Sequence, residues 1–590
     1  MLLTRWGRDL DPERVLPEYP RPQLVRASCL NLNGWWDYAV TPASGPAPAG
    51  YDGRILVPFS PEAPLSGVGR QLRPDERLTY RRRLELPDGF APAGGRVLLH
   101  FGAVDQTCVV HLNGTEVGRN GGGYVPFTCD LTDTLGPGPN ELVVDVRDRS
   151  DGHQHASGKQ RLRRGGIWYT AQSGIWQTVW AEAVPDPYVE RLTLVPLLEQ
   201  GMVEVTVHAG RSARGRPEAR VTVAGRSVMT AVGTPVRVRV DDVRPWSPDD
   251  PHLYDVEVRL GEDRVTSYVG LRSYGVGTDA RGTPRLLLNG EPVVQVGVLD
   301  QGYWPDGLLT APADEAMVHD IETMRRLGFT MLRKHVKVEP LRWYHHCDRL
   351  GMLVWQDFVN GGGRYRTAAV TWPGRYPVRL DDTRRRSLLG RGSAPGRALF
   401  REEARRTVEH LRNVPSVATW VVFNEGWGQF DARALSDEVR ALDPTRVVDH
   451  ASGWHDQGGG DLRSRHDYGR RVRTPRRRDP RPFVLSEYGG RGRRVAGHTY
   501  DSGSGFGYGD LLDAEALSRW FTALHADLAA AVRGGLSATV YTQLCDVEDE
   551  LNGLLTYDRE VLKLDESVVR AALLRLRLAA DPLTGPAAGT

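Results

Sequence analysis

The 590-residue sequence is short of cysteine. Its five cysteines, Cys29, Cys108, Cys129, Cys347 and Cys545, are scattered, odd in number and never spaced as Cys-x-x-Cys. This distribution favours neither a disulfide framework nor a zinc site. The sequence also has no Gly-x-Ser-x-Gly motif, which disfavours acyl or amide hydrolysis through a serine nucleophile.

Two further features are missing, namely a long apolar run and an excess of charge of one sign. No stretch reaches the roughly 18 apolar residues of a membrane-spanning helix. With 76 basic and 74 acidic residues, the formal net charge of +2 gives no general attraction to nucleic acid or to a membrane. The first residues carry charge too early for a signal peptide. We therefore expect a reduced, cytoplasmic protein with no nucleic-acid and no membrane partner.

The length predicts several domains, and the local pattern divides the chain into three blocks. Residues 1–185 alternate short apolar strands with Asn-Gly and Pro-Gly turns, which predicts an antiparallel β jelly-roll sandwich. Residues 186–276 continue the alternation over a shorter span, as in an immunoglobulin-like β-sandwich. In residues 277–590 strands alternate with helices, which predicts a (β/α)8 TIM barrel.

Helices are expected in the third block at 314–327, 340–350 and 401–413. The connection after 446–450 lacks a helical pattern, so we expect it to be irregular. Residues 361–398 are rich in Gly, Arg and Pro and are too long for an ordinary connection, which predicts a loop over the site. The eight barrel strands are expected to begin near Val293, Thr330, Leu353, Thr419, Arg446, Arg465, Pro482 and Ala538.

Two of these strands end on a glutamate. The first is Val-Val-Phe-Asn-Glu-Gly at 421–426 and the second is Phe-Val-Leu-Ser-Glu-Tyr-Gly-Gly at 483–490. A partly buried carboxylate must find partners or shift its pKa, so apolar strands do not normally end this way for stability. Retaining glycoside hydrolysis needs two carboxyl groups about 5–5.5 Å apart, one as acid and base and one as nucleophile. We assign these roles to Glu425 and Glu487 respectively.

Other polar residues lie at predicted strand ends, where TIM-barrel chemistry takes place. Arg333 could keep the nucleophile ionised, Tyr468 could donate a hydrogen bond to it, and Asn424 could bind a sugar hydroxyl. Stacking on a sugar and plain packing are equally open for the aromatic candidates. The full set of substrate-binding candidates is Asn424, Arg333, His335, Asp357, His466, Tyr468, Trp304, Trp427 and Tyr541.

With these motifs the chain resembles glycoside hydrolase family 2, which includes β-galactosidases, β-glucuronidases and β-mannosidases. Phe-Asn-Glu at 423–425 resembles the acid/base motif of the family, and Ser-Glu-Tyr-Gly at 486–489 resembles its nucleophile motif. Arg-Lys-His at 333–335 and His-Asp-Tyr at 466–468 resemble two further strands of the family, and the order of the three blocks matches. The resemblance implies an exo-acting retaining glycosidase with a carbohydrate substrate.

The resemblance also bears on cofactors and on assembly. It implies no cofactor, and the acidic cluster that binds extra metal in the large β-galactosidases has no obvious counterpart, so no metal is expected. Relatives often form oligomers, which leaves a homo-oligomer open.

The sugar is suggested by a departure from the family pattern. In β-glucuronidases of the family an Asn-x-Lys motif binds the sugar carboxylate just before a Gly-x-x-Thr-x-Asp-Arg segment. Here Gly-Leu-Leu-Thr-Tyr-Asp-Arg is present at 553–559, but Glu-Leu-Asn precedes it at 550–552. The missing lysine argues against a uronic acid. We expect a β-galactoside, as pyranoside or furanoside. Arabinosidase, β-mannosidase and β-glucuronidase activities, and a non-catalytic carbohydrate-binding protein, are the alternatives.

Overall fold

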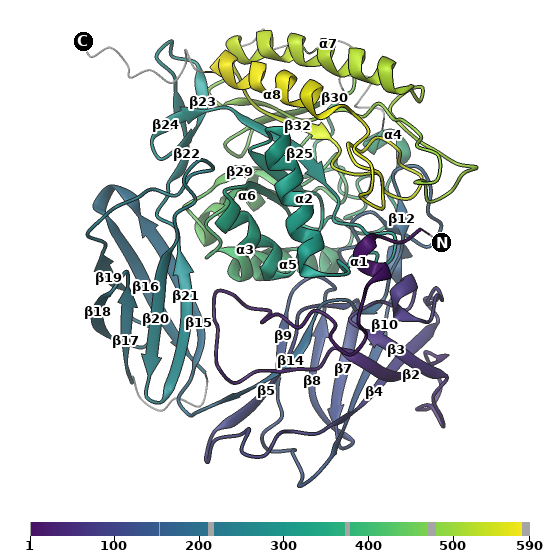
Figure 1. The fold of residues 1–590 in the computed structure, drawn as a ribbon, viewed down its shortest axis with the longest axis vertical. Helices are drawn as coiled ribbons and strands as arrows, with labels where there is room; N and C mark the ends of the chain where they lie inside the picture. Colours follow the sequence, from purple (N-terminus) through teal and green to yellow (C-terminus); the bar gives the residue numbers. More distant parts are fainter. Residues whose placement is uncertain are drawn as a thin grey trace.

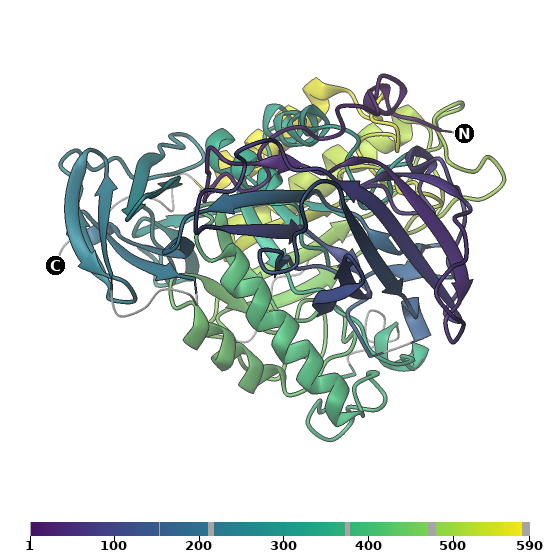
Figure 2. The same ribbon diagram turned by 90° about the horizontal axis from the view of Figure 1, so that it is seen from below.

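The computed structural model describes residues 2–152, 154–210, 217–371, 378–469, 472 and 479–580. Two β-rich blocks flank a barrel surrounded by helices. In Figure 1 the jelly roll, in purple and blue, lies below the barrel, and the immunoglobulin-like sandwich lies at its side. Figure 2 shows the same arrangement from the jelly-roll side.

The first block is built from two main antiparallel sheets, whose apolar faces enclose a core that includes Trp36, Tyr80 and Phe101. The larger sheet has the order β3 (Gly53–Val57), β2 (Gly34–Pro42), β4 (Glu76–Leu84), β10 (Asn140–Arg147), β7 (Thr107–Leu112), β8 (Thr115–Gly121). The smaller sheet has the order β1 (Leu30–Asn31), β14 (Val179–Val184), β5 (Arg96–Phe101), β9 (Phe127–Asp130). Two short pairs join β6 (Val104–Asp105) to β13 (Gly174–Ile175) and β11 (Gln160–Arg161) to β12 (Tyr169–Thr170).

The second block is a seven-stranded sandwich with a core made largely of valine. Along β16 and β20 buried residues alternate with more exposed ones, as expected of strands with one face on a core. One sheet has the order β15 (Val189–Leu197), β16 (Met202–Ala209), β19 (Val236–Arg239). The other has the order β18 (Arg226–Ala231), β17 (Glu218–Val223), β20 (Tyr254–Leu260), β21 (Asp263–Val269).

A three-stranded sheet then leads into the barrel. It consists of β22 (Tyr274–Thr278), β23 (Pro284–Leu288) and β24 (Glu291–Val293). Arg285 of β23 donates to the carbonyl oxygens of Val532 and Leu536 at 3.1 and 2.8 Å. Because Leu536 begins a barrel strand, the sheet covers the N-terminal end of the barrel, opposite the end where chemistry is expected.

The third block is an eight-stranded parallel barrel that is nearly closed. Its first and last strands in the sheet, β29 and β30, are not paired with each other. The order is β29 (Val447–Asp449), β28 (Val417–Val421), β27 (Leu353–Asp357), β26 (Met331–Lys334), β25 (Gln295–Asp300), β32 (Leu536–Thr542), β31 (Phe483–Gly489), β30 (Arg463–Asp467). The helices around it are α2 (Asp314–Leu327), α3 (Leu341–Leu350), α5 (Ala394–Leu411), α6 (Ala432–Leu442), α7 (Ala514–Arg533) and α8 (Glu566–Ala580).

The predicted elements agree with the barrel in most places, and no helix forms between β29 and β30. The helix predicted from residue 401 in fact begins at Ala394. Ser393 caps it by accepting from the N–H of Gly396, and a proline in the first turn is compatible with a helix. The expected loop at 361–398 contains a short helix α4 (Thr367–Val370), and its residues 372–377 lie outside the described part.

The first block reaches over the C-terminal end of the barrel. The backbone N–H groups of Ser157 and Gly158 both donate to the carbonyl oxygen of Asn360, at 3.1 and 2.8 Å. Ala156 also forms an isolated bridge with Gly361. Asn360 follows β27, so this segment of the jelly roll is fixed directly above the strands that carry the predicted site.

Buried ion pairs join the first two blocks to the N-terminal segment, which begins with α1 (Arg5–Arg8). Arg26 contacts Glu182 at 3.0 Å in the jelly roll and Asp263 at 2.9 Å in the second sandwich, and all three side chains are less than 5% exposed. Arg21 contacts Glu182 as well, at 2.6 Å. Within the described residues, no helix has the length and apolar character required to cross a membrane.

These contacts predict the effect of Arg26→Ala. Asp263 would lose its ion-pair partner and Glu182 one of its two, and removing one member of a buried pair costs about 3–5 kcal/mol. We expect a lower midpoint in thermal or urea unfolding. Arg226→Ala is the control, because the Arg226–Asp241 pair is exposed and such pairs contribute little. Equal midpoints for the two variants would contradict the assigned role of Arg26.

Candidate active site

Glu425 lies just beyond β28 at the C-terminal end of the barrel. Its φ is +50°, in the left-handed region, and Gly426 follows with φ +77°. Few non-glycine residues adopt this conformation, and those that do often belong to functional sites. The N–H of Glu425 donates to the carbonyl oxygen of Ser452 at 2.9 Å, which fixes the turn. The turn directs the carboxyl group to His466, whose Nδ1 lies 2.8 Å from Glu425 Oε1.

Glu487 lies on β31 and is 3% exposed. Arg333 Nη1 donates to its Oε1 at 3.1 Å, and the hydroxyl of Tyr468 donates to its Oε2. The ring of Tyr468 stacks on Tyr508 with centroids 3.7 Å apart, which holds the hydroxyl in place. The nucleophile candidate is thus bound on both oxygens.

The two glutamates lie close together. One carboxylate oxygen of each, together with a ring nitrogen of His466, all lie within 4.8 Å of one another. Among the described residues, these three form the group whose carboxylate and imidazole atoms lie close enough together to hold a metal ion. Hydrogen bonds already account for the cluster, because His466 contacts Glu425 through Nδ1 and Ser452 Oγ through Nε2, at 2.8 and 2.9 Å.

Arg333 of β26 connects most of the site. Its guanidinium donates to both oxygens of Asp357 at 3.0 and 2.9 Å, and to Asn424 Oδ1 at 2.9 Å. It also donates to the carbonyl oxygen of Ser486 at 2.9 Å and to Glu487. The side chain is fully buried. Asp357 therefore holds Arg333 in place, whereas the sequence suggested that it binds a sugar hydroxyl.

The surroundings move the pKa values of the two glutamates apart. Burial raises the pKa of Glu425, and the hydrogen bond from His466 offsets this only in part. Burial also acts to raise the pKa of Glu487, but His466, Arg333 and Tyr468 outweigh it, so the pKa is lowered. A carboxyl group that keeps its proton beside one that is ionised is the arrangement of an acid with a nucleophile.

Two buried polar atoms at this site have no hydrogen-bond partner among the described residues. They are Asn424 Nδ2 and His335 Nε2. The other ring nitrogen of His335 lies 2.9 Å from Gln301 Oε1. Burial, followed by the charges of Lys159 and Arg333, lowers the pKa of His335 well below its usual value, so the ring is neutral. Since buried polar groups are normally paired, a donor on Asn424 and a free nitrogen on His335 are suited to a ligand with hydroxyl groups.

The three aromatic candidates occupy different places. Trp427 lies beside the site, with its ring centroid 5.9 Å from that of His335. Trp304 does not join the site, because its ring contacts Trp6 and lies under Arg559 at 3.9 Å. Tyr541 packs away from the glutamates, against Tyr488 and against Phe521 of α7. Burial in the hydrophobic core explains why Trp304 and Tyr541 are aromatic.

The first block contributes residues to the site. From the sequence, Trp168 can lie either in the sandwich core or at a sugar-binding cleft, and the structure places it against Trp427 with centroids 5.0 Å apart. Sequence reasoning missed Lys159 and Tyr169, which reach Glu550 in the barrel, because these contacts join residues hundreds of positions apart. The sequence did mark Glu550 as a departure from the family pattern, but it gave no partner for it.

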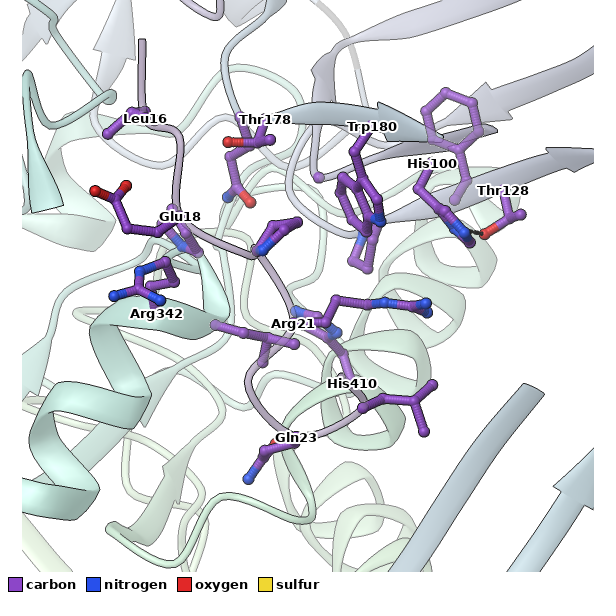
Figure 3. Close-up of a pocket in the computed structure, with 18 of the residues that line it drawn as sticks. Leu16, Glu18, Arg21, Gln23, His100, Thr128, Thr178, Trp180, Arg342 and His410 are labelled. Carbon is purple, nitrogen blue, oxygen red and sulfur yellow. Dashed lines mark hydrogen bonds between the residues drawn. The ribbon is translucent and has the colours of Figure 1, made fainter. Parts of the chain in front are cut away.

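A cavity lies elsewhere, at the junction of the N-terminal segment, the two sandwiches and helices α3 and α5. Figure 3 shows it, with Trp180, His100 and Arg21 on one side and Glu18 and Arg342 on the other. Its volume is about 400 Å³, and neither catalytic candidate lines it. Two of its arginines are paired, Arg21 with Glu182 and Arg342 with Asp314. The cavity is therefore separate from the two catalytic candidates.

The sequence matches the domains of one family. Matches to "Glycosyl hydrolases family 2, TIM barrel domain" cover residues 284–501, to "Glycosyl hydrolases family 2" residues 191–272, and to "Glycosyl hydrolase 2 galactose-binding domain-like" residues 70–173. Together they cover more than half of the chain. The chain belongs to glycoside hydrolase family 2. The resemblance inferred from the glutamate motifs is confirmed, as is the three-part fold.

Relatives with curated names are similar at a low level of identity. A β-galactosidase of Halalkalibacterium halodurans is 24% identical over 478 residues, 72% of this chain and 44% of that protein. A β-galactosidase of Thermoanaerobacter pseudethanolicus is 24% identical over 298 residues, 47% of this chain and 39% of that protein. A putative β-glucuronidase of Formosa agariphila is 24% identical over 278 residues, 44% of this chain and 32% of that protein. The chain spans less than half the length of these relatives.

Solved structures share the whole architecture. A family 2 β-galacturonidase from Eisenbergiella tayi, bound to galacturonate, superposes with a TM-score of 0.71 at 18% identity, covering 94% of this chain and 99% of that one. A β-glucuronidase from Faecalibacterium prausnitzii superposes with a TM-score of 0.71 at 21% identity, covering 96% and 100%. These likenesses show a shared fold. Their names give a uronic acid, as does that of the Formosa agariphila relative, whereas the other two curated relatives are named for galactose.

Proposed function

We propose that this member of glycoside hydrolase family 2 is an exo-acting retaining β-glycosidase. The single observation that carries the mechanism is the spacing of the two glutamates, whose carboxylate oxygens approach within 4.8 Å. Retaining enzymes place the two carboxyl groups about 5–5.5 Å apart, whereas inverting enzymes leave about 6.5–9.5 Å for a water molecule. The opposite pKa shifts of Glu425 and Glu487 support the same assignment.

In the first step Glu487 attacks the anomeric carbon while the bond from that carbon to the leaving oxygen breaks. Glu425 gives its proton to this oxygen, and a covalent glycosyl-enzyme results. In the second step Glu425 takes a proton from water, the water oxygen attacks the anomeric carbon, and Glu487 leaves as a carboxylate. Two displacements restore the β configuration. The aglycone departs with the proton it received.

Arg333 and Tyr468 keep Glu487 ionised and in position for attack, since both donate to its oxygens. Asn424 Nδ2 is the donor that we assign to a sugar hydroxyl beside the reacting carbon, where such a contact strengthens in the transition state. His335 Nε2 is assigned to a second hydroxyl. Trp427 supplies an apolar wall to the site.

For the sugar we propose a β-galactoside, as pyranoside or furanoside. The names of two curated relatives, both β-galactosidases, support galactose, whereas a third curated relative and the solved structures bear names that point to uronic acids. The cysteines are all free thiols, which supports a cytoplasmic location.

The proposal is tested by initial rates on nitrophenyl β-D-galactopyranoside, β-D-galactofuranoside, α-L-arabinofuranoside, β-D-glucuronide and β-D-mannoside. Proton NMR of the first product formed from the best substrate reports its anomeric configuration. We expect strong hydrolysis of a galactoside and release of the β-anomer. An inverted first product would exclude the double displacement, and sugar binding without hydrolysis of any substrate would favour a non-catalytic protein.

Azide distinguishes the two glutamates. In Glu487→Gly the small ion fills the place of the nucleophile, so we expect loss of nearly all hydrolysis and formation of an α-glycosyl azide. In Glu425→Ala the glycosyl-enzyme still forms from a substrate with a good leaving group, because such a group needs little acid assistance. Azide should then attack that intermediate and give the β-glycosyl azide. The configuration of each azide product is measured by NMR. If Glu487→Gly gave the β-azide and Glu425→Ala the α-azide, the roles of the two glutamates would be reversed.

The pKa shifts predict a pH effect for Tyr468→Phe. The hydroxyl favours the ionised form of Glu487, so its loss should raise the pKa of this carboxyl. The acid limb of the kcat/KM profile should therefore move to higher pH, by about 1 unit for one charge-assisted hydrogen bond. The alkaline limb, where Glu425 loses its proton, should stay at the same pH. Tyr541→Phe is the control, and equal acid limbs in the two variants would contradict the role of Tyr468.

A further inference from the structure

A buried ion pair joins the first block to the barrel next to the glutamates. Lys159, 5% exposed, donates from Nζ to the hydroxyl oxygen of Tyr169 at 3.1 Å and lies 3.5 Å from Glu550 Oε2. Tyr169 donates to the same oxygen of Glu550. Asn552 Nδ2 donates to the other, Oε1, at 2.9 Å. Glu550 is thus fully buried and bound on both oxygens by protein groups.

This pair belongs to the same electrostatic environment as the glutamates. After burial and His466, the charge of Lys159 is among the effects that lower the pKa of Glu425. It acts in the same direction on Glu487. Tyr508, which stacks on Tyr468, lies within reach of the charges of Glu550, Glu425 and Glu487. The backbone places the pair at the same end of the barrel. Ser157 and Gly158, just before Lys159, donate to the carbonyl oxygen of Asn360, whose side chain accepts from the N–H of Asn424. Glu550 forms an isolated bridge with Phe506, whose ring contacts that of Tyr508 with centroids 5.3 Å apart.

Two other buried cations near the glutamates in the described part of the chain, Arg333 and Lys334, have carboxylate partners of their own. Arg333 binds Asp357 and Glu487, and Lys334 contacts Asp300 at 2.6 Å and Glu339 at 2.8 Å. A substrate that carries a carboxylate would need a cation whose charge is not already balanced. The positive charge of Lys159 is balanced by the carboxylate of Glu550.

We propose that Glu550 is an internal carboxylate that occupies Lys159 and so restricts the pocket to neutral sugars. The inference rests on the proposed glycosidase function and names the feature that selects its substrate class. A uronate beside Lys159 would meet the negative charge of Glu550, and like charges held close in a dry site repel. A neutral sugar meets no such penalty. The pair thus rejects the acidic sugars while leaving the catalytic glutamates free to act.

The test is Glu550→Gln, which keeps the size and the hydrogen-bonding oxygen but removes the negative charge. Lys159 would then be a free cation. We expect the ratio of kcat/KM for nitrophenyl β-D-galacturonide to that for the neutral galactoside to rise about tenfold or more, as for removal of a like-charge contact. In the double variant Glu550→Gln, Lys159→Met this rise in the kcat/KM ratio should disappear, because the cation at position 159 is gone.

Glu548→Gln is the matched control. Glu548 is a neighbouring buried carboxylate that accepts from the N–H of Thr170 at 3.0 Å and does not contact Lys159. Its substitution should leave the ratio unchanged. An equal rise in Glu548→Gln and Glu550→Gln, or a folded Glu550→Gln enzyme with an unchanged ratio, would overturn the proposal.

Binding separates this inference from the proposed function. Affinities for galactose and galacturonate are measured by calorimetry, on the wild type and on Glu550→Gln, without any need for turnover. Tighter galacturonate binding in the variant supports the role of Glu550 even if hydrolysis fails. A wild-type enzyme that prefers the galacturonide or binds galacturonate more tightly than galactose would overturn the inference and leave the glycosidase function standing. This wild-type comparison is decisive even if Glu550→Gln does not fold.

Discussion

The site depends on one buried guanidinium. Arg333 is fully enclosed and donates five hydrogen bonds, which reach two carboxylates, an amide oxygen and a backbone carbonyl on or just beyond β27, β28 and β31. A buried charge is tolerated only with partners in good geometry. The same bonds that satisfy Arg333 therefore fix the positions of Asn424 and Glu487. Removing it would leave Asp357 as an unpaired buried charge as well as releasing the nucleophile.

Burial alone would raise the pKa of both glutamates, so their difference must come from their partners. Glu487 lies among Arg333, Tyr468 and His466, which together favour the ionised form. Glu425 has fewer charged partners, and the nearby negative charge of Glu487 opposes its ionisation. The pKa values of two identical side chains in one pocket are thus shifted in opposite directions, because the strands deliver different neighbours to each.

The jelly roll takes part in the site and does more than flank the barrel. Its segment near Ser157 is fixed to the carbonyl oxygen of Asn360, and the side chain of the same Asn360 accepts from the N–H of Asn424 at 2.7 Å. Lys159 and Trp168 follow in that segment and reach the pocket. Specificity can therefore depend on the first block, while the two glutamates proposed as catalytic lie on the barrel.

The sequence by itself determined the three-part fold and singled out the two glutamates, because periodicity and strand-end carboxylates are local signals. It also indicated Arg333, Asn424, His335, His466 and Tyr468 as a group, since the ends of parallel strands meet at one edge of a barrel. Only the tertiary structure separated Trp427 from Trp304 and Tyr541, because burial in a core and exposure to a pocket look alike along a chain. It alone paired Lys159 with Glu550. Residues 391 positions apart share no sequence pattern, and their contact exists because the jelly roll packs on the barrel.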